Sequence, residues 1–273
     1  MEDFANQTLH LIWDLVRRLG SDAEKPTLDA MALVMIAVGL VTYVALQLLP
    51  APYGRYSSPS YGLLVPARIA WVVQECPAFF VPLYVWLYMD NGAPALANKI
   101  LAGLFMLHYF QRTFFYSFLI RGGKPTPLAP FLMAFVFCTY NGYMQARSIL
   151  KFRGPIPDVA DPVFLLGVAL FVVGLLINIQ SDHILRNLRS DGSKAYKIPY
   201  GGMFDYITAA NFFGEIVEWW GFALAAWQLQ GFAFAIFTMA NLVPRGLSHH
   251  AWYLNKFRGE YPVDRYAVLP PLV

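Results

Sequence analysis

The chain has 273 residues, of which 58% are hydrophobic, 16% are aromatic and only 14% are charged, and its mean hydropathy is +0.46. A soluble domain carries about 25% charged residues, so this composition excludes an ordinary soluble fold and indicates an integral membrane protein. The formal net charge of +3 is too small to indicate a nucleic-acid partner, and Cys76 and Cys138 lie in apolar runs with no metal-ligand spacing.

The first 28 residues are expected to form an amphipathic extension at the membrane surface. Apolar side chains recur there at helical spacing, at Leu9, Ile12, Trp13 and Val16. The stretch lacks the basic start and the long apolar core of a cleaved signal peptide. Residues 29–273 are then expected to form a single membrane domain.

Seven apolar runs follow, each close to the 20 or so residues that a helix needs to cross the hydrocarbon core. They lie near 30–49, 69–89, 100–120, 128–146, 162–180, 206–229 and 231–250. Pro244 interrupts the last run, so we expect that helix to kink or to leave the bilayer there. The predicted fold class is therefore an all-α integral membrane protein with seven transmembrane helices.

The distribution of Lys and Arg predicts the orientation. Loops 50–68, 121–127 and 181–205, together with the tail from 245, hold more of these residues than the opposite loops do. Positively charged loops tend to remain in the cytosol. We therefore expect the N-terminus outside or in the lumen and the C-terminus in the cytosol.

Polar residues inside the spans are the first candidates for a functional site, because lipid excludes them unless a cavity or a partner receives them. The stretch AWVVQECPAFF places Gln74 and Glu75 near the middle of the second span. A carboxylate at the centre of a bilayer costs about 2.5 to 3.5 kcal/mol even on the lenient insertion scale. Function is the favoured explanation for this pair.

Four further groups of polar residues lie at helical spacing. The third span places His108 and Arg112 four residues apart, with Tyr109 beside them. The other three groups form stripes, at Asn178, Asp182, Arg186 and Arg189; at Asn211, Glu215 and Glu218; and at Arg245, His249 and Tyr253. Taken alone, Asn178, Asp182 and Asn211 are each explained as well by a hydrogen bond between helices as by ligand binding. Anchoring to anionic lipid likewise explains the basic residues of loop 181–205.

Several motifs are absent from the sequence. It contains no Gly-rich Rossmann or P-loop signature, no HxxxH or CxxC, and no GxSxG elbow. A metal site is therefore not expected, and any nucleotide must bind within the helix bundle. The residues alone predict a helical membrane enzyme with a buried carboxylic acid and a polar, cytosol-facing site for an anionic cofactor.

Four stretches resemble the steroid 5-alpha-reductase family, particularly its type 2 branch: HYFQRTFFYSFLIRGGKPTP, INIQSDHILRNLR, YKIPYGGMFDYITAANFFGEIVEWWGFALA and YLNKFRGEYPVDRYAVLP. The resemblance covers roughly residues 60–273 and keeps the order and relative spacing of these motifs. It implies a seven-helix enzyme that uses NADPH to reduce the 4,5 double bond of 3-oxo-4-ene steroids such as testosterone and progesterone.

The resemblance also implies site residues. The catalytic set would be Gln74, Glu75 and Tyr109 at the steroid carbonyl, with Trp71 and Phe213 lining an apolar steroid slot. NADPH would be bound by Asn178, Asp182, Arg189, Lys197, Asn211, Glu215, Arg245, His249 and Tyr253, with Arg112 and Arg121 as further contacts. Glu75 can donate a hydrogen bond only when it is protonated, and an apolar environment favours that neutral form.

Two positions depart from the family pattern. Lys197 stands where the family has arginine, so the charge remains but the two-pronged hydrogen-bonding geometry is lost. Ser248, His249, His250 and Ala251 replace a longer run of histidines.

Other functions remain open at this point. The substrate could be another lipid enone or enoyl compound or a polyprenol, and the chain could be a membrane methyltransferase of the isoprenylcysteine or phospholipid type. A seven-helix receptor or transporter would use the acids of the second and sixth spans as ion or proton relays. We expect a monomer in contact with membrane lipid, in the endoplasmic reticulum if the host is eukaryotic or in the inner membrane if it is bacterial.

Overall fold

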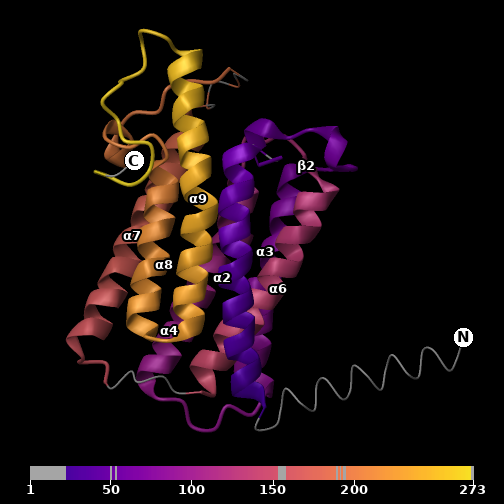
Figure 1. Ribbon diagram of the computed structural model, residues 1–273, viewed down its shortest axis with the longest axis vertical. Helices are drawn as coiled ribbons and strands as arrows, with labels where there is room; N and C mark the ends of the chain where they lie inside the picture. The colour runs from indigo at the N-terminus through magenta and orange to yellow at the C-terminus, as the bar shows by residue number, and fades with distance from the viewer. Residues whose placement is uncertain are drawn as a thin grey trace, which may run out of the picture.

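The computed structural model describes residues 23–49, 51–52, 54–152, 158–188, 190, 192 and 195–271. Within these ranges the chain forms a bundle of long helices that run along its longest axis (Figure 1). The all-α fold is therefore confirmed. Most of the expected extension 1–28 lies outside the described residues, and its last residues, from Glu24 onward, belong to the first described helix.

Seven helical columns make up the described part of the bundle. Their helices are α2 (Glu24–Leu48), α3 (Ala67–Tyr88), α4 (Leu96–Phe110), α6 (Leu128–Leu150), α7 (Pro162–Asn187), α8 (Ala210–Ala226) and α9 (Leu229–Lys256). A π-helical segment, Gln111–Tyr116, and the short α5, Ser117–Leu119, continue α4 without a break. Each column overlaps one of the seven spans expected from the apolar runs.

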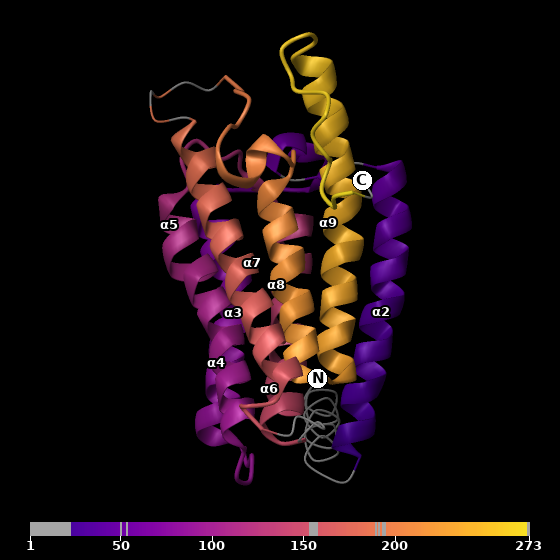
Figure 2. The same ribbon diagram turned by 90° about the vertical axis from the view of Figure 1, so that its left-hand side faces the viewer.

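Short elements close one end of the bundle. Strands β1 (Leu64–Val65) and β2 (Thr126–Pro127) pair antiparallel, with Leu64 opposite Pro127. Three 3-10 turns complete the elements, at Gly54–Tyr56, Pro59–Tyr61 and Gly202–Asp205. Figure 2 shows that the loop before α8 and the chain after α9 lie at this same end. The loops richest in Lys and Arg therefore share one end of the molecule.

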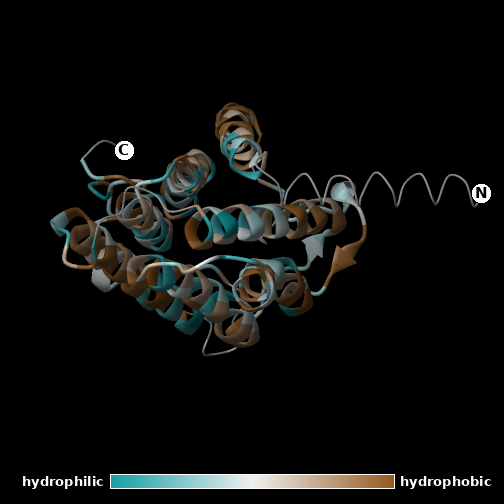
Figure 3. Ribbon diagram, turned by 90° about the horizontal axis from the view of Figure 1, so that it is seen from below, coloured by the Kyte–Doolittle hydropathy of each residue, from teal (hydrophilic) through white to brown (hydrophobic). Residues whose placement is uncertain are grey.

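The outer surface of the bundle is apolar. Seen from below, hydrophobic residues make up much of the helices (Figure 3). Leu33, Val41 and Met133 are exposed by 59%, 69% and 73%, as expected for side chains that face lipid. Among the described residues, α2, α3 and α7 are long and apolar enough to cross a membrane. The seven crossings and their orientation remain predictions.

Helix α9 runs through an internal proline. Pro244 lies inside it, and the helix continues without a break from Leu229 to Lys256, while a kink or an exit from the bilayer at the proline stays a prediction. A proline inside a helix costs about 3 kcal/mol because it removes a backbone hydrogen bond. Leu242 and Val243 are buried in a cluster with residues of α8. This burial favours continued helix on both sides of the proline.

Glycines bring α7 and α8 into backbone contact. A Cβ atom added at Gly214 would lie 2.6 Å from the backbone nitrogen of Asn178, and one added at Gly174 would overlap the backbone nitrogen of Glu218. Gly167 and Gly221 make similar close approaches. Gly214 therefore allows α7 and α8 to approach closely. The contact fixes how the polar stripes of α7 and α8 face each other.

Candidate functional site

The bundle encloses one large cavity toward the end that carries the basic loops. Its volume is about 1210 Å³, and residues of α2, α3, α4, α6, α7, α8 and α9 line it. Single-ligand pockets commonly measure about 300 to 1,000 Å³. The cavity therefore has room for more than one ligand of ordinary size.

Polar groups on α3 and α4 face the cavity. Gln74, Glu75 and Tyr109 all line it, and Gln74 Nε2 donates a hydrogen bond to Glu75 Oε1 at 3.3 Å. Tyr109 is 4% exposed. Trp71 lines the cavity one helical turn from Glu75. The resemblance assigned Gln74, Glu75 and Tyr109 to the steroid carbonyl and Trp71 to the apolar slot. All four side chains line this one cavity.

Pro77 lies just after this group and interrupts the hydrogen bonds of α3. Because proline has no N–H, the carbonyl oxygen of Val73 loses its partner four residues later. Cys76 Sγ donates to that oxygen at 3.3 Å. This contact helps α3 to remain helical where Gln74 and Glu75 point into the cavity.

The π-helical segment aligns the polar residues of the third column. Ser117 Oγ donates to the carbonyl oxygen of Arg112 at 2.8 Å, across the wider turn. Arg112 and Tyr116 line the cavity together with His108 and Tyr109. Single π turns within helices are frequent at functional sites, and here the wider turn keeps successive polar residues on the cavity side.

Arg112 connects three columns. Its Nη1 lies 2.9 Å from Asp182 Oδ2 on α7, and its guanidinium stacks 4.1 Å from the ring centre of Tyr116 and 5.1 Å from that of Trp71. The arginine therefore contacts Trp71 of the second span. The pair with Asp182 could not be identified from spacing.

The α7–α8 contact carries a seam of hydrogen bonds. Asn211 Nδ2 donates to Asp182 Oδ1 at 3.3 Å, and Asn178 Nδ2 donates to the Asn211 carbonyl oxygen at 3.0 Å and to Glu215 Oε2 at 3.5 Å. Asp182, Asn211 and Glu215 line the cavity, whereas Asn178 is absent from its lining. Asn178 thus serves as a contact between helices in this structure.

Basic and aromatic residues surround the cavity at the basic-loop end. The expected residues there are Arg121, Lys197, Arg245, His249 and Tyr253, and all five line the cavity. Arg189 lies outside the described residues. The end of the cavity that holds these residues is strongly cationic, which suits a ligand with phosphate groups.

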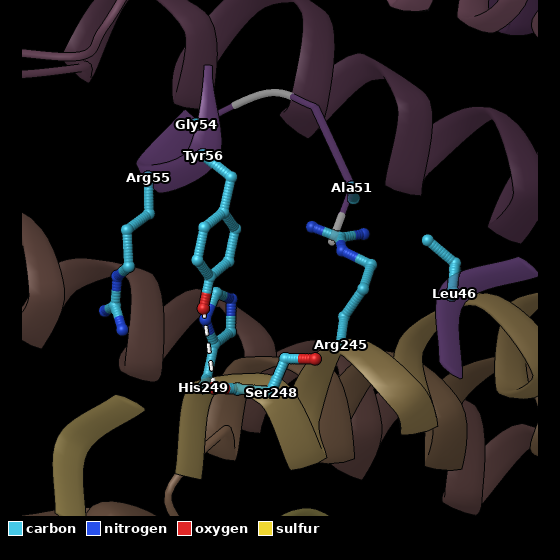
Figure 4. A pocket seen from close by; sticks show the side chains of 8 residues that line it. All are labelled: Leu46, Ala51, Gly54, Arg55, Tyr56, Arg245, Ser248 and His249. Atoms are coloured by element: carbon cyan, nitrogen blue, oxygen red, sulfur yellow. Dashed lines mark hydrogen bonds between the residues drawn. The ribbon is translucent and has the colours of Figure 1, made fainter. Parts of the chain in front are cut away.

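A smaller pocket of about 80 Å³ adjoins this rim (Figure 4). The Tyr56 ring stacks on His249 with 5.8 Å between centroids, and its hydroxyl donates to the Ser248 carbonyl oxygen at 3.4 Å. Burial raises the pKa of Tyr56, so its hydroxyl remains a neutral donor. The turn after α2 is thereby attached to α9 above the large cavity.

Sequence reasoning missed Arg55. Its guanidinium lies 3.9 Å from the ring centre of Trp252, 4.8 Å from that of Tyr253 and 5.0 Å from that of Tyr196. It lines both pockets. The only signal in the sequence was a lone arginine in a loop rich in Gly, Pro, Ser and Tyr, and no spacing rule connects such a residue with α9.

His108 has a partner that was not expected. Its Nδ1 lies 2.8 Å from Glu218 Oε1, and both side chains are almost completely buried. The partner of Glu218 therefore comes from α4. The two acids of α8 also lie in different environments, because Glu215 lines the cavity and Glu218 does not.

The aromatic residue of α8 at the cavity is Phe212. It lines the cavity, and Arg245 stacks over its ring at 4.7 Å. Phe213, the residue assigned from the resemblance, is absent from the lining. Adjacent helical residues point about 100° apart, and at this position Phe212 faces the cavity and Phe213 does not. Phe234 and Phe237 of α9 add apolar lining that the motifs did not identify.

The sequence matches known proteins over most of its length. Residues 124–273 match the family model described as 3-oxo-5-alpha-steroid 4-dehydrogenase. The chain is 51% identical over 257 residues to 3-oxo-5-alpha-steroid 4-dehydrogenase 1 of Bos taurus, which covers 92% of this chain and 99% of the relative. The corresponding human type 1 protein is 50% identical over 252 residues, 91% of this chain and 96% of the relative.

A type 2 relative is less similar. Human 3-oxo-5-alpha-steroid 4-dehydrogenase 2 is 42% identical over 251 residues, 90% of this chain and 96% of the relative. The family expected from the motifs is confirmed. The particular likeness to type 2 is not supported, because the type 1 relatives are more similar, at 51% and 50% identity against 42%.

Proposed function

Because the chain belongs to the 3-oxo-5-alpha-steroid 4-dehydrogenase family, we propose that it reduces the 4,5 double bond of 3-oxo-4-ene steroids with NADPH. Members of this family are integral membrane oxidoreductases that act on CH–CH bonds, and this chain is one of them. The observation that supports the proposal most is one cavity lined by Glu75 and Tyr109 and also by the basic residues Arg121, Lys197 and Arg245. Testosterone and progesterone are the substrates we expect.

The residues of the rim fit a nicotinamide dinucleotide phosphate. Arg121, Lys197 and Arg245 line the cavity where the pyrophosphate and the 2′-phosphate would lie. His249 Nδ1 and Arg55 Nη1 are buried donors or acceptors without a hydrogen-bond partner among the described residues. A ligand with several polar groups would satisfy such atoms. When bound, NADPH would supply hydride to C5 of the steroid.

Glu75 and Tyr109 would hold the C3 carbonyl oxygen. Negative charge grows on that oxygen as C5 is reduced, so donors already aimed at it lower the barrier. Gln74 holds Glu75 Oε1 through its amide, which leaves the other carboxyl oxygen to donate its proton. The second hydrogen bond would come from the Tyr109 hydroxyl, and C4 would then be protonated by water or through Tyr109.

The apolar part of the lining suits a steroid skeleton. Phe137 and Phe234 line the cavity together with Trp71, and a rigid fused-ring hydrocarbon gains most from such a surface. A reductase of another lipid enone or of a polyprenol would need the same NADPH-binding residues. A membrane methyltransferase would need only a cavity within the helices. The carbonyl-facing pair favours the steroid enone over both.

The proposed reaction has a direct test. Purified protein incubated with NADPH and testosterone or progesterone is expected to give a product two hydrogens heavier, detected by mass spectrometry. NADPH, and not S-adenosylmethionine, should raise the temperature of unfolding, because a ligand that binds only the folded state stabilises it. Protection by S-adenosylmethionine with no reduced product would support the methyltransferase instead.

Asn211 and Glu215 offer a test of the cofactor end. Replacing Asn211 with Leu or Glu215 with Gln should weaken NADPH binding by roughly 10-fold, about the value of one or two hydrogen bonds, and should change steroid binding much less. Separate titrations of cofactor and steroid measure the two effects. Equal loss of both affinities would indicate general misfolding and would argue against a cofactor role.

We also propose the membrane arrangement. Seven crossing helices, with the basic loops and the C-terminus in the cytosol, would give the cationic rim direct access to cytosolic NADPH. Support comes from the seven helical columns and from the gathering of the basic loops at one end. We expect a monomer in the endoplasmic reticulum or in a bacterial inner membrane.

A further inference from the structure

A row of buried amides lies beneath the cavity, away from the cationic rim. Asn141 and Gln145 occupy successive turns of α6, and Gln230 lies near the start of α9. Their side chains are 0%, 1% and 1% exposed. Polar groups this deeply buried need defined hydrogen-bond partners. The partners here determine which way each amide points.

A backbone carbonyl group determines how the amide side chains in this row are oriented. Gln145 Nε2 lies 2.8 Å from the carbonyl oxygen of Gln230 and 3.2 Å from Asn141 Oδ1. A carbonyl oxygen can only accept, so the atom of Gln145 that faces it must be the NH₂ group. The same NH₂ group then donates to Asn141, whose oxygen must face Gln145. The Asn141 NH₂ group therefore points in the opposite direction.

Asn141 Nδ2 is buried and has no hydrogen-bond partner among the described residues. Tyr109 is a neighbouring polar side chain that interacts with Asn141, so its hydroxyl is an acceptor available to this unpaired NH₂ group. Close packing holds α6 in place at this level, because a Cβ atom added at Gly142 would lie 3.2 Å from the Cα of Ala78 in α3. This packing holds the backbone beside Asn141 in place.

We propose that Asn141 is a positioning residue for Tyr109: its NH₂ group donates to the phenol oxygen and so directs the phenol proton into the cavity. A hydroxyl has one proton, and an oxygen that accepts from Asn141 is left to donate its own proton elsewhere. The cavity is the open side of Tyr109. This inference rests on the proposed function in one respect, the role of Tyr109 as a donor to the substrate carbonyl.

The amide row thus connects the donor to the base of the bundle. The Gln230 side chain continues the row, because its Nε2 donates to Asp29 Oδ1 on α2 at 2.7 Å. Asn98 provides a contrast. It is also a buried amide between α4 and α6, but its Nδ2 already donates to the carbonyl oxygen of Ile149 at 2.7 Å, whereas Asn141 Nδ2 has no partner among the described residues. Asn98 is therefore the matched control for a purely structural asparagine.

The test is a double-mutant cycle on the full-length protein. Asn141→Leu should lower kcat by about 10-fold, the value of one hydrogen bond to a catalytic group, with little change in the KM for NADPH. In a Tyr109→Phe background the same substitution should cause almost no further loss, because the hydroxyl it orients is gone. Asn98→Leu should lower the unfolding temperature but leave kcat nearly unchanged.

A second cycle measures the contact without turnover. The losses in unfolding temperature of Asn141→Leu and Tyr109→Phe should be less than additive if the two side chains are hydrogen-bonded. If Asn141→Leu does not fold, Asn141→Ser replaces it, because a serine hydroxyl is too short to reach Tyr109.

The outcomes separate the two hypotheses. A Tyr109→Phe protein with wild-type kcat would refute the donor role of Tyr109, and the positioning proposal with it. A slow Tyr109→Phe protein in which Asn141→Leu still multiplies the loss would refute only the positioning proposal. Sub-additive losses in both cycles would establish that Asn141 acts through Tyr109.

Discussion

Replacing Glu75 with Leu is expected to lower kcat for steroid reduction by about 100 to 1,000-fold, the usual effect of removing a donor to a developing oxyanion. NADPH binding should persist, because the proposed phosphate contacts lie on other elements, the loops and α9. Product formation followed by mass spectrometry measures the first effect. The rise in unfolding temperature on adding NADPH measures the second.

Two further variants make the Glu75 result specific. Glu75→Gln keeps an N–H donor of nearly the same shape and should retain partial activity. Glu260→Gln, at an exposed site after α9, should behave as wild type and controls for the loss of one acidic group. Wild-type turnover in Glu75→Leu would show that the carboxyl group is not the carbonyl donor.

Replacing Gly174 with Ala is expected to have the largest effect on folding. The added methyl group would overlap the backbone nitrogen of Glu218 and lie 2.5 Å from the carbonyl oxygen of Gly214. Both are backbone atoms, so α7 and α8 must move apart. Overpacking of this kind costs roughly 1 to 3 kcal/mol or more. The unfolding temperature should fall, and NADPH affinity should fall with it because Asp182 and Asn211 would separate.

Gly103 provides the control for that substitution. It lies in the middle of α4, and a Cβ atom added there meets nothing within 4 Å. Gly103→Ala is the same chemical change in a helix, and it should be neutral or should stabilise by up to about 1 kcal/mol. Equal unfolding temperatures for the two variants would show that the α7–α8 contact does not limit stability.

The helices were largely predictable from the sequence. An apolar run long enough to cross lipid has few alternatives to a helix, because every backbone group must be hydrogen-bonded within the segment. Local rules say less where tertiary contacts determine the backbone. Burial of Leu242 and Val243 keeps α9 intact through Pro244, and the π turn in the third column has no recognisable signal in QRTFFY.

The candidate site was predictable in its residues but not in its pairings. Helical spacing placed Asn211 and Glu215 on one face, and both line the cavity. Spacing cannot say which helix lies opposite a face. The partner of Glu218 is His108, and the partner of Asp182 is Arg112. Arg55 was missed for the same reason, because its three aromatic neighbours come from distant parts of the chain.

The sequence by itself determined the class of protein, the positions of the helices and the family, because composition, apolar run length and ordered motifs are local properties. It also singled out Gln74 and Glu75, since lipid makes a carboxyl group in a span costly wherever the other helices lie. Only the tertiary structure decided which groups surround that carboxyl. The glycine contact between α7 and α8 and the packing of α6 on α3 set the rotation of each helix, and rotation determines which side chains meet.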